Sequence, residues 1–467
     1  MSQKTKAAPN ALSTAELQVK IEAFIHEVAQ FFDPEIAEAQ ARQSGFVQRK
    51  SKLTGHLFLT IFTFGMSLYG TPTLNQLVGL LTLIVPEVEL QREGLHQRIN
   101  EQAVEFFEAM LSLAIKLTVP HELDLQLLAS FQRILLFDST SFQLPPTLTP
   151  YFQGSGGDAS TAVIKILFGY DLKSAQFFYL LLNGTAADHL LKHGLLDEIH
   201  AQDLEISDLG FFGLEVFAAL DAKGAFFLSR LKTDVTLYQK DAAGEWKVFD
   251  LVAFVQQLKA TRTEVAVYLK NKHTVLKTRL IIERVPPQVK AERLRKLKQR
   301  NQKRGRQAKK RTKILQAVNL HITNAAAEVL PAKYVRQLYA IRWQIELIFK
   351  SWKSNFALAK VTGTRPQRIK CMLYAKLLFI FISTKLIRVA TSLAWRTHGR
   401  EVSAFQATQH ILVMGHQWLR ALILEPETAH TILSNAIKFM VNHCLKTKSN
   451  QRVYPLEILK IIELDLA

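Results

Sequence analysis

Apolar residues in the first quarter of the chain recur at the spacing of an α-helix. Two sets show this most clearly: Ile21, Phe24, Ile25 and Val28, and then Ala103, Phe106, Phe107, Met110 and Leu111. Residues three or four positions apart share one face of a helix, so residues 16 to 118 are predicted to be helical. A plain helical bundle is one interpretation. A DNA-end-binding domain, which Arg42, Arg49, Lys50 and Lys52 would suit, is the other.

The pattern then changes to short apolar runs separated by a helical segment. Strands are predicted at residues 134–137, 163–168, 176–182, 206–207, 225–228 and 318–323, with a helix at 214–220. Short apolar runs of this kind are typical of buried strands. Strands mixed with helices predict an α/β core.

Residues 233 to 316 look like a separate block. Strand-like stretches at 264–269 and 275–282 are followed by a basic segment, Lys290 to Lys313, with thirteen Lys and Arg residues against one acid, Glu292. A charge run is usually a solvated surface, but phosphates would relieve the mutual repulsion of so dense a run. The basic segment therefore predicts contact with nucleic acid, for which the candidate residues are Lys296, Lys298, Arg300 and Arg304.

The overall charge points the same way. The chain has 467 residues, and its 59 Lys and Arg against 40 Asp and Glu give a net charge of +19, which favours a polyanionic partner. Apolar residues make up 48%, which excludes global disorder. Two apolar runs, 57–68 and 372–387, are shorter than the roughly 20 residues of a spanning helix, so they are expected to be core helices and no membrane partner is expected.

The two cysteines, Cys371 and Cys444, are too few for a disulfide framework or a cysteine-rich zinc module. Such sparse cysteine usage fits a reducing compartment, so a cytoplasmic location is expected.

A long helix is predicted from Pro331 to about Phe356, and it carries two stripes. One is apolar and can face a core: Leu338, Ile341, Ile345, Ile348 and Trp352. The other contains Tyr339, Arg342, Glu346 and Lys353, which fall within a sector of roughly 60°. This second stripe indicates the rim of a shared site. The alternative is an exposed face with an ion pair between Arg342 and Glu346.

Two aspartates follow predicted strands: Asp138 in Leu-Phe-Asp-Ser-Thr and Asp208 in Ile-Ser-Asp-Leu-Gly. Strand-end aspartates often cap helices or turns, so each alone is weak evidence. Together with Glu346 on a helix packed against the sheet, they can converge on one point. Three carboxylates there would suit Mg²⁺ or Mn²⁺. Two such ions can act on the attacking and leaving oxygens of phosphoryl transfer.

The stripe also resembles a family signature. Tyr339, Arg342, Glu346 and Lys353 match, in type and spacing, the YREK signature of bacterial DDE transposases of the insertion-sequence-four type. Asp138 and Asp208 resemble the first and second acidic blocks of that family. Two further segments are similar: Phe226 to Lys232, which includes Arg230, and Gly94 to Asn100. The resemblance covers roughly residues 90 to 385, and no motif can be matched in residues 1–60 or 400–467.

The resemblance implies an α/β RNase H-like catalytic core with a β-rich insertion, flanked by N-terminal and C-terminal helical regions. The corresponding division is a helical DNA-binding region at 1–125, catalytic core at 126–232 and 317–390, insertion with the basic segment at 233–316, and a helical region at 391–467.

The resemblance also implies a chemistry. Asp138, Asp208 and Glu346 would be the catalytic residues and would bind two Mg²⁺ or Mn²⁺ ions. Tyr339, Arg342 and Lys353 would hold a DNA phosphate beside a flipped base, with Arg230 as a further DNA contact. The steps would be nicking at the element end, hairpin formation, hairpin opening and strand transfer into target DNA. Two DNA ends must be paired, so a homodimer is expected in the synaptic complex.

Three alternatives stay open. A metal-dependent nuclease of the same fold would need the three acids but not Tyr339 and Lys353. A catalytically inactive DNA-binding derivative would not need the acids at all. An RNA-binding protein would explain the basic segment but leave the acids unexplained. Trp246 is the only tryptophan of the insertion, and its surroundings match no motif, so a hydrophobic anchor is the simpler interpretation of it.

Overall fold

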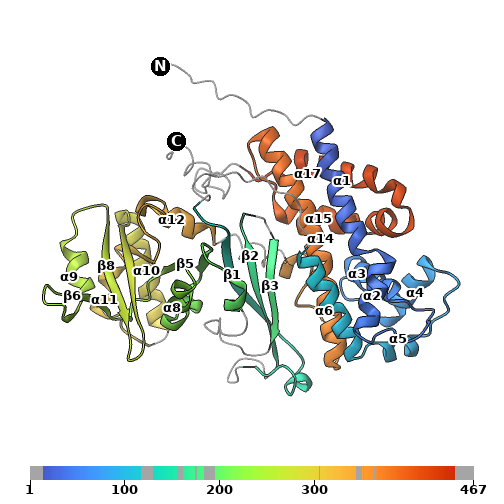
Figure 1. Cartoon of the computed structure of the whole chain (residues 1–467), viewed down its shortest axis with the longest axis horizontal. Coiled ribbons are helices and arrows are strands. Elements are labelled where there is room, and N and C mark those ends of the chain that lie inside the picture. The colour runs from blue at the N-terminus through green and yellow to red at the C-terminus, as the bar shows by residue number, and fades with distance from the viewer. Residues whose placement is uncertain are drawn as a thin grey trace.

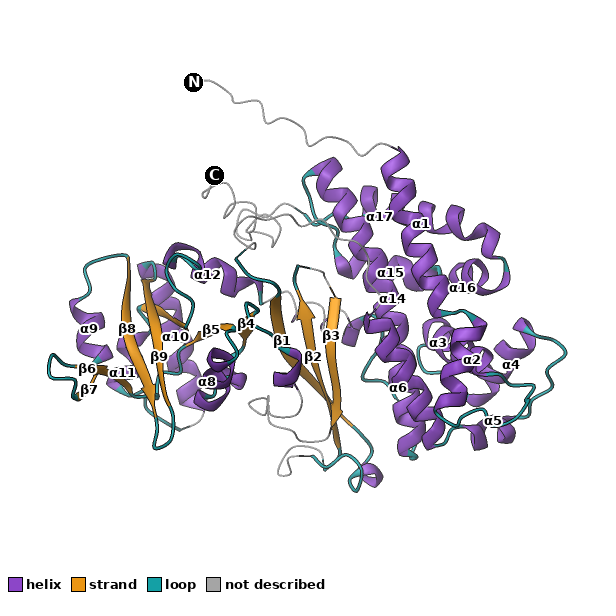
Figure 2. Ribbon diagram, in the orientation of Figure 1, coloured by secondary structure: helices purple, strands orange, loops and turns teal. Residues whose placement is uncertain are grey.

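A long mixed sheet and a bundle of helices lie side by side in the computed structural model (Figure 1). The structure describes residues 14–116, 130–154, 161–173, 176–183, 195–303, 305–342, 346, 350, 352–361 and 363–447. The helices of the first and last parts of the described chain gather at one end of the molecule, and the strands, with further helices beside them, extend from the middle to the other end (Figure 2).

The helical part combines both ends of the described chain. Its helices are α1 (Thr14–Phe31), α2 (Pro34–Gln43), α3 (Gly55–Tyr69), α4 (Leu74–Ile84), α5 (Arg92–Arg98), α6 (Glu101–Lys116), α14 (Pro366–His398), α15 (Ala404–Val413), α16 (Gly415–Leu419) and α17 (Ala429–His443). Helix α14 contacts α3, α6 and α17, so the first and last thirds of the chain share one core. The predicted helical character of residues 16–118 is confirmed for the described residues.

Local sequence explains where several of these helices begin. The Thr54 hydroxyl accepts a hydrogen bond from the Leu57 amide at the start of α3. Thr73 and Gln76 form a capping box at the start of α4. Such caps satisfy amides that have no partner inside the helix.

Helix α14 is the one described helix that is long and apolar enough to cross a membrane, and α3 with α4 passes the same test only as a pair bent by 117°. Inside the protein, 67% of the most apolar stretch of α14 is buried. Its lysines have internal partners: Lys376 Nζ donates to the Ala357 carbonyl at 2.9 Å, and Lys385 pairs with Glu27 at 3.5 Å. Both apolar runs are therefore core helices in this structure, as predicted.

The sheet has ten strands in the order β3-β2-β1-β4-β5-β10-β9-β8-β6-β7. Their bounds are β1 (Ile134–Gln143), β2 (Val163–Asp171), β3 (Gln176–Asn183), β4 (Leu204–Ser207), β5 (Phe226–Arg230), β6 (Leu237–Lys240), β7 (Trp246–Val248), β8 (Arg262–Lys270), β9 (Val275–Arg284) and β10 (Val318–Thr323). Strands β1, β4 and β5 pair in parallel, and the other pairs are antiparallel. Every predicted strand is present.

One strand differs from its prediction. Strand β1 was expected to end at Phe137 but continues to Gln143, because residues after Phe137 keep pairing with β2. The parallel pairing of β1 with β4 does stop at Phe137, opposite Ser207. Asp138 therefore lies inside a strand, at the point where β1 loses one of its two neighbours.

Helices cover both faces of the sheet. They are α8 (Leu214–Ala222), α9 (Leu251–Gln257), α10 (Pro287–Lys303), α11 (Lys310–Leu315) and α12 (Ala332–Ile341). Short helical turns are η1 (Pro146–Leu148), η2 (Leu195–Glu198), η3 (Leu209–Phe211), η4 (Arg420–Leu424) and η5 (Pro426–Thr428).

The two faces of the sheet pack in different cores. Leu136, Ile206 and Leu228 share a core with α12 and α14, whereas Phe137 and Phe227 share another with α8. Alternate residues of each strand thus face opposite layers.

The block at residues 233–316 continues the core sheet rather than standing apart from it. Strand β9 pairs with β10 along its length, and β8, β6 and β7 follow outward. The basic segment lies mainly on α10 and α11. The five-part division of the chain remains a prediction.

The predicted long helix is divided in the structure. Helix α12 begins after Pro331 as expected, but it ends at Ile341 with Arg342 as its C-cap residue. Further along, residues 346, 350 and 352–354 are helical. Leu338, Ile341 and Trp352 are buried as predicted. Ile345 and Ile348 lie outside the described residues.

Candidate active site

The parallel pairing of β1 and β4 brings two aspartates together. Phe137 lies opposite Ser207, so the next residues along the two strands are Asp138 and Asp208. Both follow residues that face the α8 layer, so both side chains belong to the opposite face, which α12 and α14 cover. Asp208 also precedes η3 without capping it by its side chain. Its carboxylate is therefore not used as a helix cap.

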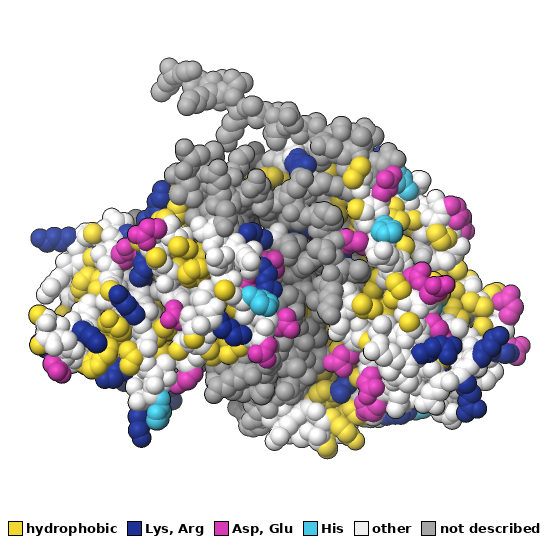
Figure 3. Space-filling model, in the orientation of Figure 1, with side chains coloured by type: hydrophobic (Ala, Val, Ile, Leu, Met, Phe, Trp, Pro, Cys, Tyr) yellow, Lys and Arg dark blue, Asp and Glu magenta, His cyan; other side chains and the backbone are white. Residues whose placement is uncertain are grey.

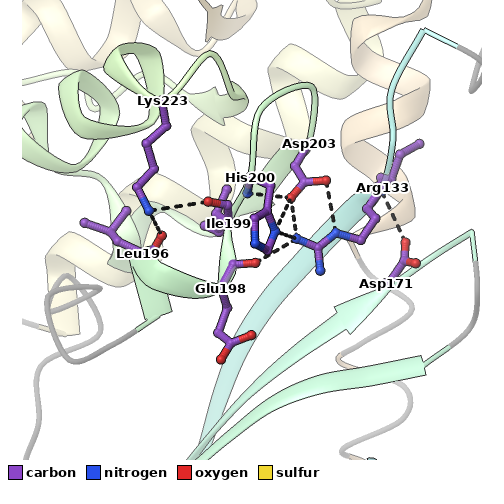
Figure 4. Close-up of polar contacts among 9 residues, drawn as sticks. Arg133, Asp171, Leu196, Glu198, Ile199, His200, Asp203 and Lys223 are labelled. Carbon is purple, nitrogen blue, oxygen red and sulfur yellow. Dashed lines mark hydrogen bonds and ion pairs between the residues drawn. The ribbon is translucent and has the colours of Figure 1, made fainter. Parts of the chain in front are cut away.

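An ion pair holds the other end of these strands in register. Arg133 precedes β1 and Asp203 precedes β4, and Arg133 Nε donates to Asp203 Oδ1 at 3.0 Å (Figure 4). The carboxylate of Asp203 is fully buried and also accepts from the His200 amide at 2.8 Å. Arg133 Nη2 donates to the Glu198 carbonyl at 2.7 Å. Breaking this cluster would leave a buried charge unpaired, so it stabilises the start of the β1–β4 pair whose register places Asp138 beside Asp208.

Asp138 lies in a half-buried environment shaped by the other candidate residues. Burial raises the pKa of its carboxyl to about 6. The negative charges of Glu346 and Asp208 add to the rise, whereas a hydrogen bond from the Ser139 amide and the charge of Arg342 oppose it. Asp138 is therefore within electrostatic reach of both of the other predicted acids.

Glu346 makes an ion pair with Arg342, with Nη2 and Oε1 2.7 Å apart. This is the contact that the alternative interpretation of the stripe expected. The Arg342 side chain is only 12% exposed, however, so it does not lie on a solvated face. Its Nε and Nη1 are buried and make no hydrogen bond to any described part of the chain. A buried guanidinium with unused donors is a receptor for an anion's oxygens.

Tyr339 completes the inner part of the stripe. Its side chain is 8% exposed, and its ring lies 5.7 Å from the Arg342 guanidinium carbon. Burial raises the pKa of the hydroxyl, and the charges of Arg342 and Asp208 act on it in opposite directions. The hydroxyl is buried, and the Arg342 side chain beside it opposes the rise in its pKa both by its charge and by a hydrogen bond. It can therefore donate to a ligand at neutral pH.

Lys353 lies on the exposed rim of the same site. Its Nζ reaches the Ser141 carbonyl of β1 at 3.4 Å. Burial lowers the pKa of Lys353, and the charge of Asp138 raises it. Next to it, the Trp352 ring packs on Phe168 at 4.5 Å between centroids, and Phe168 lies opposite Asp138 in the β1–β2 register. Trp352 thus anchors the segment that carries Lys353 over Asp138.

The donor set fits a divalent cation by its chemistry. Asp138 is half-buried and experiences the negative charges of Asp208 and Glu346, so a positive ion beside it would relieve the repulsion that helps to raise its pKa. Within the described ranges, no three acidic, His or Cys side chains are gathered closely enough to hold one ion together. Glu346 is instead paired with Arg342.

The remaining predicted DNA contacts are spread over the other lobe. Lys296, Lys298 and Arg300 lie on α10 and are exposed, and Lys296 pairs with Glu292 at 2.6 Å. Arg304 lies outside the described residues. Lys and Arg side chains are spread over the lobe that holds β6 to β9 (Figure 3). Arg230, at the end of β5, is exposed. None of these side chains belongs to the carboxylate cluster.

Trp246 lies on β7, at the outer edge of the sheet. Its ring meets the Tyr268 ring edge to face at 5.0 Å, and Lys240 and Lys270 lie over it at 4.9 and 4.8 Å. These contacts agree with the simpler interpretation of Trp246 as an anchor of the outer strands.

Sequence reasoning missed a buried acid beneath the site. Glu205 of β4 is fully buried, and neither carboxyl oxygen has a hydrogen-bond partner in the described structure. Burial raises its pKa to about 7, and the Ser207 hydroxyl opposes the rise. The Glu205 side chain lies on the face of the sheet opposite to that of Asp208. The sequence signal that could have revealed it is a single acid between the apolar residues Leu204 and Ile206.

Comparisons with known proteins identify the family of this chain. A family model described as "Transposase DDE domain" matches residues 129–382, which is more than half of the chain. A transposase for insertion sequence element IS231F of Bacillus thuringiensis subsp. israelensis is 32% identical over 408 residues, covering 84% of this chain and 85% of the relative.

More distant relatives cover the chain in the same way. A transposase for insertion sequence element IS1151 of Clostridium perfringens is 28% identical over 470 residues, covering 96% of this chain and 98% of the relative. A putative transposase InsL of Escherichia coli is 25% identical over 382 residues, covering 79% and 95%. The chain therefore belongs to the DDE transposases of bacterial insertion sequences, which are enzymes that act on DNA.

Proposed function

We propose that this protein binds the ends of its insertion sequence, cleaves the DNA there through a hairpin intermediate and joins the freed ends to target DNA. One observation carries this proposal. The charges of Asp208 and Glu346 both act on Asp138, and Arg342, next to Tyr339, has two buried donors with no partner in the described structure. A metal-dependent nuclease needs the acids, but it has no use for this second set.

The DDE domain implies dependence on a divalent metal. We propose that Asp138, Asp208 and Glu346 hold two Mg²⁺ or Mn²⁺ ions. When bound, such ions polarise the phosphodiester and promote loss of a proton from the attacking water or hydroxyl. Glu346 would hold the ion with a carboxylate whose Oε1 lies 2.7 Å from Arg342 Nη2 in this structure, so Arg342 would stand next to the ion.

The stripe residues would hold the DNA strand for this chemistry. Arg342 presents Nε and Nη1 from a buried position, and a guanidinium matches the paired oxygens of a phosphate. The Tyr339 hydroxyl can donate to the same group, and Lys353 can reach it from the rim. The proposed task of these three side chains is to fix one phosphate while the strand is bent and a base leaves the stack.

Three further aspects of the proposal follow from its substrate. DNA is the macromolecular partner, so the protein is proposed to work in the cytoplasm, where the nucleoid lies, with no membrane partner. Two element ends must be brought together for transposition, so a homodimer is proposed for the synaptic complex. The alternative is a catalytically inactive derivative, which would still bind DNA but would not cleave or join it.

The test uses the DNA that borders the gene for this chain. Inverted repeats are expected at the two borders, and a labelled border duplex is expected to be nicked in the presence of Mg²⁺ and then converted to a hairpin. A denaturing gel resolves both products. Nicking without any hairpin would favour the nuclease, and binding without cleavage would favour the inactive derivative.

Neutralising the basic segment is expected to weaken DNA binding without regard to sequence. Lys296, Lys298 and Arg300 are exposed on α10, and the removal of each phosphate-binding charge should reduce the slope of log K against log salt by about one. Fluorescence anisotropy with border and scrambled duplexes at several salt concentrations measures this slope for the triple Gln variant.

The control for this variant is Lys438→Gln, because Lys438 is exposed on α17 at the other end of the molecule. An unchanged slope for the triple variant would mean that the basic segment is only solvated surface.

A further inference from the structure

A pocket of about 510 Å³ opens beside Tyr339, between β5, β10, α10 and α12. Its chemistry comes from Arg230, Arg293, His321 and Arg336, which are far apart in the sequence. None of these residues except Arg230 was singled out by the sequence, and Tyr339 is the one lining residue that the pocket shares with the candidate active site.

The sheet explains why these residues meet. His321 of β10 lies directly opposite Arg230 of β5 in the strand register, so the two side chains share one face. Leu228, two residues before Arg230, packs in the core under α12, which identifies this face as the one that carries Asp138 and Asp208. The His321 ring then contacts Tyr339 of α12 at 5.1 Å between centroids.

The pocket concentrates positive charge. Arg293 is held in place by donating to the Val318 carbonyl at 3.2 Å and to Asn319 Oδ1 at 2.7 Å. Burial lowers the pKa of Arg293, and the nearby charges of Arg230 and Arg336 lower it further. The three guanidinium groups therefore repel one another across the pocket.

Little acid compensates for this charge. Glu283 pairs with Arg336 at 3.1 Å, but it also pairs with Arg262 at 3.6 Å. The Arg230 side chain has no hydrogen bond or ion pair within the described structure. An anion bound in the pocket would balance the charge of these arginines.

His321 supplies the second observation. Its side chain is 4% exposed and lines the pocket, yet its ring makes no hydrogen bond in the part of the chain that the structure describes. Burial lowers the pKa of His321 to about 3, and Arg230 and Arg336 contribute to that shift. The imidazole is therefore neutral at pH 7 and keeps an N–H that can donate to an oxygen.

We propose that this pocket binds a second backbone phosphate of the DNA, distinct from the phosphate held by Tyr339, Arg342 and Lys353. Arg230, Arg293 and Arg336 supply the charge, and the His321 ring supplies a hydrogen bond. Tyr339 borders both places, since the charges of Asp208 and Arg230 both act on its hydroxyl. The pocket thus sets the path of the strand past the carboxylates. This inference rests on the proposed function, because it takes border DNA as the ligand.

The test measures binding without cleavage, in an Asp138→Asn background and with no added metal. Border duplexes that carry one neutral methylphosphonate at successive positions are compared for this parent protein and for its Arg293→Gln derivative. Removing one charged hydrogen bond should weaken binding by about tenfold or more. One methylphosphonate position is expected to weaken binding by the parent and to have little further effect on the Arg293→Gln protein.

Arg230→Gln is the second variant, because its exposed side chain has no partner in the described structure and its replacement should leave the fold intact. It is expected to lose sensitivity to the same position. Arg420→Gln, an exposed arginine in the helical part, is the control and should keep the sensitivity of the parent. Equal sensitivity of parent, Arg293→Gln and Arg230→Gln at every position would overturn the pocket as a phosphate site. Cleavage of border DNA by the wild-type protein separates that result from a failure of the proposed function.

Discussion

Glu346→Gln is expected to abolish Mg²⁺-dependent cleavage of border DNA while leaving binding largely unchanged. The substitution keeps the size of the side chain but removes the charge that a divalent metal needs. Metal stabilisation of a phosphoryl transition state amounts to several kcal/mol, which corresponds to a loss of about a thousandfold in rate or more. Asp138→Asn and Asp208→Asn are expected to behave alike, since the three acids are proposed to hold the metal together.

Single-turnover cleavage on a denaturing gel and anisotropy of the uncleaved duplex measure the two properties separately. Glu328→Gln is the matched control, because Glu328 is exposed just before α12 and has no proposed role in binding or cleavage. Cleavage by the Glu346→Gln protein at a rate near that of the wild type would refute the assignment of Glu346. Loss of both binding and cleavage would instead indicate that the variant fails to fold.

Arg342→Ala and Lys353→Ala are expected to nick DNA but to form hairpins about ten- to a hundredfold more slowly. Nicking requires the carboxylates and a water molecule. Hairpin formation also requires a sharply bent strand whose phosphate is held while a base is out of the stack. A charged hydrogen bond to phosphate contributes roughly 1.5–3 kcal/mol, which gives the expected range. The two donors of Arg342 that have no described partner are placed to bind that phosphate.

The measurement starts from border duplexes that already carry the nick, so that only the hairpin step is observed over time. Lys350→Ala is the control, because Lys350 is exposed on the same helical segment but does not belong to the stripe. Lys353→Ala is the more discriminating variant, since Arg342→Ala also removes the partner of Glu346. Equal hairpin rates in the wild type and both variants would mean that the stripe has no role in the hairpin step. The contact between Arg342 and Glu346 would then be only a structural ion pair.

Tertiary pairing decided several features that local patterns could not. Whether β1 continues beyond Phe137 depends on β2, which is about thirty residues away, so the apolar run alone gave too short a strand. The division of the predicted helix after Ile341 is likewise invisible in its apolar periodicity. The phosphate pocket needs Arg230, Arg293 and Arg336 from three separate elements, and no spacing in the sequence relates them. Glu205 is buried only because strands and a helix layer surround it.

The sequence by itself determined the helical character of the N-terminal region, the α/β core and eight of the ten strands, all but β6 and β7. It also identified Asp138, Asp208 and Glu346 as candidates. These features depend on the periodicity of side chains along the backbone, which neighbouring residues set. Helical periodicity likewise predicted that Tyr339, Arg342, Glu346 and Lys353 share one stripe. Register between distant strands depends instead on which segments meet, and only the folded chain shows that the step after Phe137 and Ser207 places two aspartates side by side.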